Sequence, residues 1–108
     1  MTVKELTEKL GLKEFVLCDP DREITGGYAG DLLSWVMGRA SEGDAWITIM
    51  TNLNVIAVAS LADTACVILA EGVTPDQELC GIAKAKCINL LGGEDSTFEL
   101  CAAVKAII

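Results

Sequence analysis

Short apolar runs alternate with stretches that carry helix signals, and this alternation limits the fold more than any other feature of the chain. Strands are expected over about residues 14–18, 45–50, 66–70 and 87–91. Each is a continuous apolar run, which is typical of strands whose two faces are both covered. We therefore expect an α/β fold of three layers, α/β/α, with helices on both faces of a mostly parallel sheet of about four to five strands.

Capping signals precede the expected helices. These helices are expected over about residues 3–10, 31–39, 53–61, 75–84 and 97–107. In the same order, their N-caps are the side chains of Thr2, Asp31, Asn52 or Asn54, Thr74 and Ser96. Glu5 and Glu99 complete capping boxes with the first and last of these caps, and Gly11 ends the first helix.

Composition narrows the classes of partner. The 108 residues fit a single domain over residues 1–108. Because 52% of them are hydrophobic, more than a small domain buries easily, we expect a homodimer. A net charge of −8 gives no basic surface for nucleic acid or for an anionic membrane. We see no signal peptide and no apolar run of the roughly 18 residues that span a membrane, and the cysteines, expected to be reduced, imply a reducing cytoplasm.

The cysteines and the missing histidines limit the chemistry. The cysteines are Cys18, Cys66, Cys80, Cys87 and Cys101, an odd number without a C-x-x-C pair. We expect all five to be buried and reduced, with no metal site and no cofactor. The chain has no histidine, which removes the commonest general base, and it has no phosphate-binding loop of the G-x-x-x-x-G-K-[ST] type. We therefore expect no catalytic residues and no enzyme activity.

The loop at residues 19–30 concentrates polar and glycine residues before an apolar helix. Its candidate ligand-binding residues are Asp21, Arg22, Thr25, Gly26, Gly27 and Tyr28. Arg22 either clamps an anion or pairs with a nearby acid, Asp19, Asp21 or Glu23. The glycines either make a tight turn with positive φ or offer amides to an anion. Tyr28 stacks on a base or packs across a dimer interface, and the acids are expected to be solvated rather than to bind a cation.

Two expectations concern surfaces. In a parallel sheet the loops at 19–30, 51–54, 71–74 and 92–96 would gather at the carboxyl ends of the strands, where ligands bind. The helices at 31–39 and 53–62 are apolar on nearly every side, so one face of each is expected at a dimer interface. The interface candidates are Leu32, Trp35, Val36, Val55 and Ile56.

The polar loop carries a resemblance to a known family. Asp21-Arg22, then Thr25-Gly26-Gly27 and the run from Tyr28 to Ser34, closely resemble the DRTGG domain, although Glu23 and Ile24 separate Asp-Arg from Thr-Gly-Gly. The match extends through residues 54–58, 66–69 and 96–99. It implies an α/β/α domain similar to the N-terminal domain of HPr kinase/phosphorylase.

Such domains occur as regulatory or dimerising modules, for example beside CBS domains in a regulatory pyrophosphatase and in some phosphotransacetylases. Short stand-alone members occur near hydrogenase and redox genes of anaerobes and are often labelled serine kinase of HPr. We expect a non-catalytic regulatory or scaffolding domain that dimerises and serves a larger cytoplasmic enzyme system. The alternative is a small-molecule sensor that binds an adenine nucleotide or another anion at residues 21–30.

Overall fold

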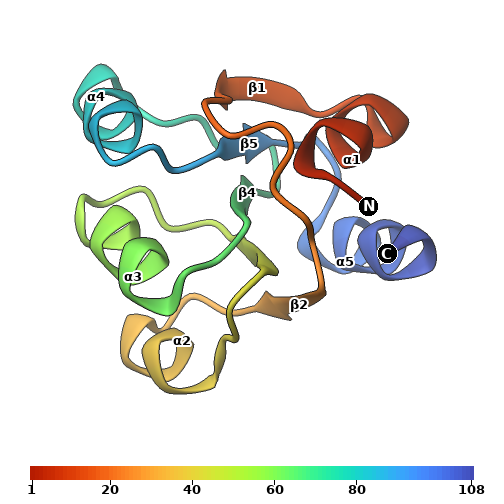
Figure 1. Cartoon of the computed structure of the whole chain (residues 1–108), viewed down its shortest axis with the longest axis horizontal. Helices are drawn as coiled ribbons and strands as arrows, with labels where there is room; N and C mark the ends of the chain where they lie inside the picture. The colour runs from red at the N-terminus through yellow and green to blue at the C-terminus, as the bar shows by residue number, and fades with distance from the viewer.

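A five-stranded sheet lies between two layers of helices in the computed structural model, which describes residues 1–108 (Figure 1). The strands are β1 (Lys13–Val16), β2 (Gly26–Ala29), β3 (Asp44–Thr48), β4 (Cys66–Leu69) and β5 (Leu90–Gly92). Their order across the sheet is β1-β5-β4-β3-β2. The pairs β2–β3, β3–β4 and β4–β5 are parallel, and β1 pairs antiparallel with β5.

The helices divide between the two faces of the sheet. Helices α2 (Leu33–Arg39), α3 (Asn54–Ala62) and α4 (Gln77–Ala85) cover one face, and α1 (Val3–Leu10) and α5 (Thr97–Ile107) cover the other (Figure 1). Alternate residues of β3 serve the two cores, since Trp46 packs toward α2, α3 and α4 and Ile47 packs toward α1 and α5. The expected three-layer α/β/α fold with a mostly parallel sheet is confirmed.

Local capping chemistry begins and ends the terminal helices as the sequence predicts. The Thr2 hydroxyl accepts from the Glu5 amide at 3.1 Å, and the Glu5 carboxylate accepts from the Thr2 amide at 3.0 Å. Gly11 ends α1 in the left-handed region, at φ 62°. The Ser96 hydroxyl accepts from the Glu99 amide at 3.2 Å and begins α5. None of the helices is long and apolar enough to cross a membrane.

Three expected caps are wrong. Neither Asn52 nor Asn54 is the N-cap of α3; that position is Leu53, although the Asn52 side chain accepts from the Asn54 amide at 3.0 Å. Asp31 does not cap α2; its carboxylate accepts from the Thr48 hydroxyl at 2.7 Å and from the Ile49 amide at 3.0 Å. It therefore joins the loops that follow β2 and β3. Thr74 does not cap α4 either, because that helix begins later, with the Asp76 carboxylate accepting from the Leu79 amide at 2.8 Å.

The segment expected as one connecting loop contains a strand. Residues 26–29 form β2, the edge strand beside β3, and neither Gly26 nor Gly27 has a positive φ. The tight-turn interpretation of these glycines is therefore wrong. Gly26 is needed for space, because a Cβ there would lie 2.7 Å from the Asp44 carboxylate oxygen Oδ1. Small residues thus let the edge strand approach the buried start of β3.

Residues 17–25, called the strap below, cross from one edge of the sheet to the other between β1 and β2 (Figure 1). The strap also supports α1, because the amides of Val3 and Lys4 donate to the carbonyls of Arg22 and Pro20, each at 3.0 Å. These two amides belong to the first turn of α1, which has no acceptors of its own for them. The strap is therefore an integral part of the fold.

Candidate functional site

A groove of about 330 Å³ lies between the edge strand β2 and helix α5, and we call it the β2–α5 groove. Its lining residues are Thr25, Gly26, Gly27, Tyr28, Ala29, Ile47, Cys101, Val104, Lys105 and Ile108. Four of the expected ligand-binding residues, Thr25, Gly26, Gly27 and Tyr28, thus lie together beside it. Sequence reasoning did not find Lys105, because only the fold brings the last turn of α5 against β2.

Small side chains on one face of β2 make this groove. The Tyr28 ring packs against the core beneath α2, α3 and α4, so strand alternation places Gly27 and Ala29 on the opposite face, toward α5. Neither residue has a side chain large enough to fill the space in front of Ile47. The glycine-rich segment therefore provides a hollow as well as a close strand contact.

The polar groups of the groove are few. Lys105 is exposed and is the one charged side chain in the lining. The Thr25 hydroxyl donates to the Glu42 carbonyl at 3.2 Å. Because β2 is paired on one side only, backbone amides and carbonyls on its other side are open to a partner. The groove can therefore offer hydrogen bonds and one positive charge to a ligand.

The groove contains no activated nucleophile. Burial raises the pKa of the Cys101 thiol above its ordinary value of 9.0, so the thiol is protonated at neutral pH. The other residues that line the groove include no histidine and no acidic side chain.

Arg22 and Asp21 lie outside the groove. Arg22 donates from Nη1 to the Asp63 carboxylate at 3.0 Å and from Nη2 to the Asp63 carbonyl at 2.9 Å. It therefore ties the strap to the end of α3, and the expected pairing with Asp19, Asp21 or Glu23 is wrong. Asp21 is exposed on the strap.

The expected gathering of loops at the carboxyl ends is wrong for the strap. Because β1 is antiparallel to β5, residue Val16 pairs with Leu90, and the strap leaves β1 at the amino end of the parallel strands. In parallel α/β sheets, ligands bind in a crevice at the topological switch point, where the strand order reverses. Strands β2 to β5 follow one another in a single direction across the sheet, so their order has no such switch point. The β2–α5 groove lies at the sheet edge beside β2.

Large apolar side chains are exposed at the carboxyl ends of β2 and β3. Leu32, Trp35, Ile49 and Leu53 are between 40% and 57% exposed, and we call them the carboxyl-end patch. They lie in the loops after the two adjacent strands and in the first turn of α2. The Asp31 carboxylate holds these loops together through its hydrogen bond from Ile49.

The structure divides the expected interface residues into two groups. Leu32 and Trp35 belong to the exposed patch, and the Arg39 guanidinium stacks on the Trp35 ring at 3.9 Å. In contrast, Val36, Val55 and Ile56 are buried in the core of the chain itself. The assignment of these three residues to a dimer interface is therefore wrong, because their side chains pack inside the core between α2, α3 and the sheet.

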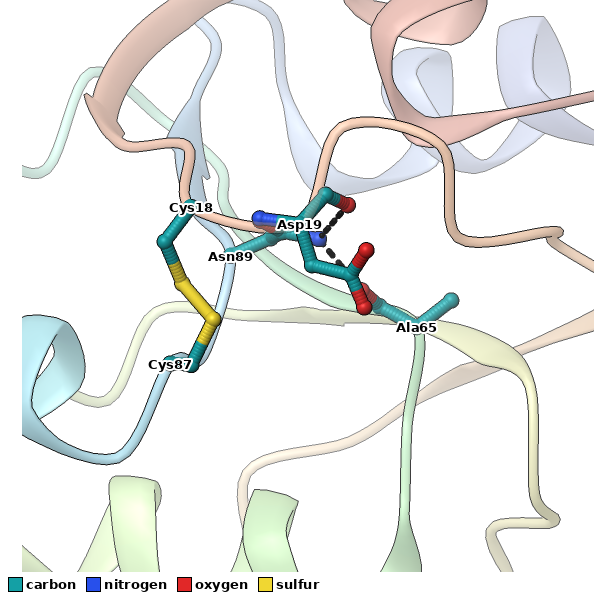
Figure 2. Close-up of a disulfide and its surroundings, with 5 residues drawn as sticks. All are labelled: Cys18, Asp19, Ala65, Cys87 and Asn89. Atoms are coloured by element: carbon teal, nitrogen blue, oxygen red, sulfur yellow. Dashed lines mark hydrogen bonds between the residues drawn. A yellow bond between two sulfur atoms is a disulfide. The ribbon is translucent and has the colours of Figure 1, made fainter.

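Cys18 and Cys87 form a disulfide between the strap and the turn before β5 (Figure 2). The expectation that all five cysteines are buried and reduced is wrong for this pair, whose residues are both exposed. Cys87 has a φ of 53° and lies before β5, which begins at Leu90 rather than at the expected residue 87. Cys66 fits the expectation, since its thiol is buried and its pKa is raised by that burial to about 12.

Comparisons with known proteins agree with this architecture. No family model and no curated protein matches the chain. A solved structure does match, with a TM-score of 0.71 and 16% sequence identity: the CBS and DRTGG domains of the regulatory region of Clostridium perfringens pyrophosphatase, complexed with the activator diadenosine tetraphosphate. The fold is DRTGG-like. The match covers 96% of this chain and 44% of that one, so the chain spans less than half the length of its structural neighbour.

Proposed function

We propose that this chain is a non-catalytic regulatory and scaffolding domain, which forms a homodimer and serves a larger cytoplasmic enzyme system of redox or hydrogenase type. The carboxyl-end patch carries the proposal. Four large apolar side chains are exposed in the loops after the adjacent strands β2 and β3 and in the first turn of α2, whereas an ordinary surface shows such residues singly and scattered. The neighbouring fold belongs to a regulatory region, which supports the same kind of role.

The patch is suited to a self-complementary contact. Trp35 and the guanidinium stacked on it provide an aromatic and an arginine, the residue types that concentrate binding energy at interfaces. In a two-fold dimer the patch of one copy would face the same patch of the other, so the four side chains would be covered in both copies. The charge of the chain makes contacts between its polar faces unfavourable, which leaves an apolar patch as the better site of association.

Light scattering after size-exclusion chromatography tests the proposal. At tens of micromolar we expect a mass of twice the 11.4 kDa of the chain. A variant with Leu32→Ser and Trp35→Ser is expected at the monomer mass with an unchanged circular dichroism spectrum. Phe98→Ser is the matched control, because it removes a residue that is 79% exposed on α5, outside the patch. A monomeric wild type, or a dimer that survives in the patch variant, contradicts the proposal.

A second function is supported by the β2–α5 groove. We propose, as the alternative, a sensor that binds an adenine nucleotide or another small anion there. The groove volume of about 330 Å³ is at the lower end of the roughly 300–1,000 Å³ of small-molecule pockets, which favours one nucleoside unit over two. Lys105 takes the role of the cation in this proposal, because Arg22 is already bound to Asp63.

Thermal denaturation separates the two functions. The panel contains AMP, ADP, ATP and diadenosine polyphosphates, each with and without magnesium. Binding at about a hundred times Kd adds roughly 2.7 kcal/mol, or on the order of ten degrees for a domain of this size. Lys105→Gln is expected to abolish the shift, and Lys9→Gln, in the last turn of α1, to preserve it. No shift with any nucleotide would contradict the sensor and leave the dimer proposal untouched.

A further inference from the structure

The Cys18–Cys87 pair differs from the other cysteines in being open to reagents in solution. Both of its residues are exposed, whereas Cys66 is fully buried and Cys80 and Cys101 are partly buried. Neither member of the pair belongs to one of the two hydrophobic cores. Opening the bond would therefore expose no core side chain, and a reductant can reach the sulfur atoms without unfolding the domain.

A second tie holds the same two segments together next to the disulfide. The Asn89 side chain accepts from the Asp19 amide at 3.0 Å and donates to the Asp19 carbonyl at 2.8 Å (Figure 2). It also donates to the Ala65 carbonyl at 3.0 Å, which fixes it to the start of β4. Asn89 is two residues from Cys87, and Asp19 follows Cys18. These hydrogen bonds do not depend on the S–S bond.

The flanking backbone is anchored as well. Leu17 packs against the core under α1 and α5, and Ile88 is buried in the core under α2, α3 and α4. Beyond them, Val16 pairs with Leu90 in the antiparallel β1–β5 ladder. The Cα atoms of the two cysteines are 5.6 Å apart, and packing and hydrogen bonds on both sides would keep them near that separation after reduction.

From this arrangement we infer that Cys18 and Cys87 form a reversible thiol–disulfide exchange site, whose electron donor is a dithiol. A thiolate of the donor attacks one sulfur of the pair, forms a mixed disulfide and releases the other cysteine as a thiolate, which takes a proton. The second thiol of the donor then attacks the mixed disulfide and frees the remaining cysteine. Two electrons and two protons pass to the pair, and the donor leaves as its own disulfide.

The inference does not rest on the proposed function, and it accounts for a disulfide in a chain expected in a reducing compartment. Persistent structural disulfides are rare in such compartments, whereas transient ones act in catalysis or in redox sensing. An exposed pair that is held in place by other interactions matches the transient class. A structural disulfide would instead be expected where little else holds the segments together.

Reduction of the wild-type protein with dithiothreitol tests the site, with maleimide labelling and mass spectrometry to locate thiols. We expect complete reduction of Cys18 and Cys87 without denaturant, and a cooperative thermal transition that remains at a lower midpoint. On transfer to a glutathione redox buffer, the same pair is expected to re-form. Resistance to reduction in the native state, loss of the cooperative transition, or a different pairing on reoxidation would each overturn the inference.

The rate of reoxidation tests whether the folded domain holds the thiols of Cys18 and Cys87 close together. At the same oxidant concentration, the folded reduced protein is expected to re-form the bond roughly tenfold faster or more than the protein in denaturant, because the thiols are already neighbours. The Cys80→Ser variant, which removes a partly buried free cysteine outside the pair, is the control for side reactions and is expected to re-form the bond as the wild type does. Equal rates in the folded and unfolded proteins would show that the fold does not hold the thiols together, against the inference.

Discussion

Asn89 supports a larger part of the fold than its size suggests, and replacing it with alanine tests that view. The residue is 2% exposed, and its side chain makes three hydrogen bonds, two with Asp19 and one with Ala65. Each such bond contributes a net 0.5–1.5 kcal/mol, so Asn89→Ala is expected to lower the free energy of unfolding by about 3 kcal/mol. For a domain near this length that corresponds to roughly 12 °C or more in Tm.

Urea denaturation followed by circular dichroism measures this loss, with the Cys18–Cys87 bond intact in every sample. Asn54→Ala is the matched control, since Asn54 is exposed at the start of α3 and its side chain makes no hydrogen bond. The control is expected within about 0.5 kcal/mol of the wild type. A loss below about 1 kcal/mol for Asn89→Ala would refute this reasoning. It would show that the β1–β5 pairing holds the strap without help from the Asn89 side chain.

Three further predictions concern single residues. Gly26→Ala is expected to lower the free energy of unfolding by about 1–3 kcal/mol, because the new Cβ would meet the Asp44 carboxylate at 2.7 Å. The control is Gly81→Ala in α4, where the space is open. In the same urea titration its stability is expected to be unchanged or higher. The pKa of Glu5 is lowered from 4.5 by its hydrogen bonds with Thr2, so the ionised carboxylate stabilises the fold above pH 4.5. This contribution disappears as the pH falls through the lowered pKa. An acid titration of stability is expected to show the loss in the wild type and not in Glu5→Gln. Cys66, with a pKa of about 12, is expected to stay unlabelled by iodoacetamide at pH 8 in the native protein, and labelling at the rate of an unfolded control would contradict its burial.

The parts of the fold set by near neighbours could be predicted from the sequence. The Thr2–Glu5 capping box and the Ser96 cap need only a few adjacent residues, and both begin helices as expected. The apolar runs predicted three of the strands closely, β1, β3 and β4. For β3 and β4, which are buried throughout, the reason is that a continuous apolar run is best covered on both faces of a sheet. The three-layer arrangement follows from their alternation with helices.

Pairing between distant segments could not be predicted in this way. The direction of β1 depends on its partner β5, which follows far along the chain, and the reversal moves the strap to the other end of the sheet. Strand β2 lacks strand-like composition, since it opens with two glycines, and only the folded chain shows that a side chain at Gly26 would meet the neighbouring Asp44. The Cys18–Cys87 bond joins residues 69 apart, where spacing carries no signal.

In the candidate site, too, the sequence predicts features set by near neighbours and misses contacts between distant segments. The segment with Thr25, Gly26, Gly27 and Tyr28 was singled out by its composition, and these residues do line the β2–α5 groove. Arg22 was assigned to the same site, but its partner Asp63 lies 41 residues away and becomes a neighbour only in the folded chain. Lys105 reaches the groove from α5 for the same reason.

The most direct test of the proposed dimer is a dilution series of the ¹⁵N-labelled wild-type protein, followed by its amide NMR signals. If the carboxyl-end patch joins two copies, the signals that change from millimolar to micromolar concentration are those of residues 30–35 and 49–53, and the line widths fall together with them. Signals that do not change on dilution, or changes confined to the face covered by α1 and α5, would contradict the proposal.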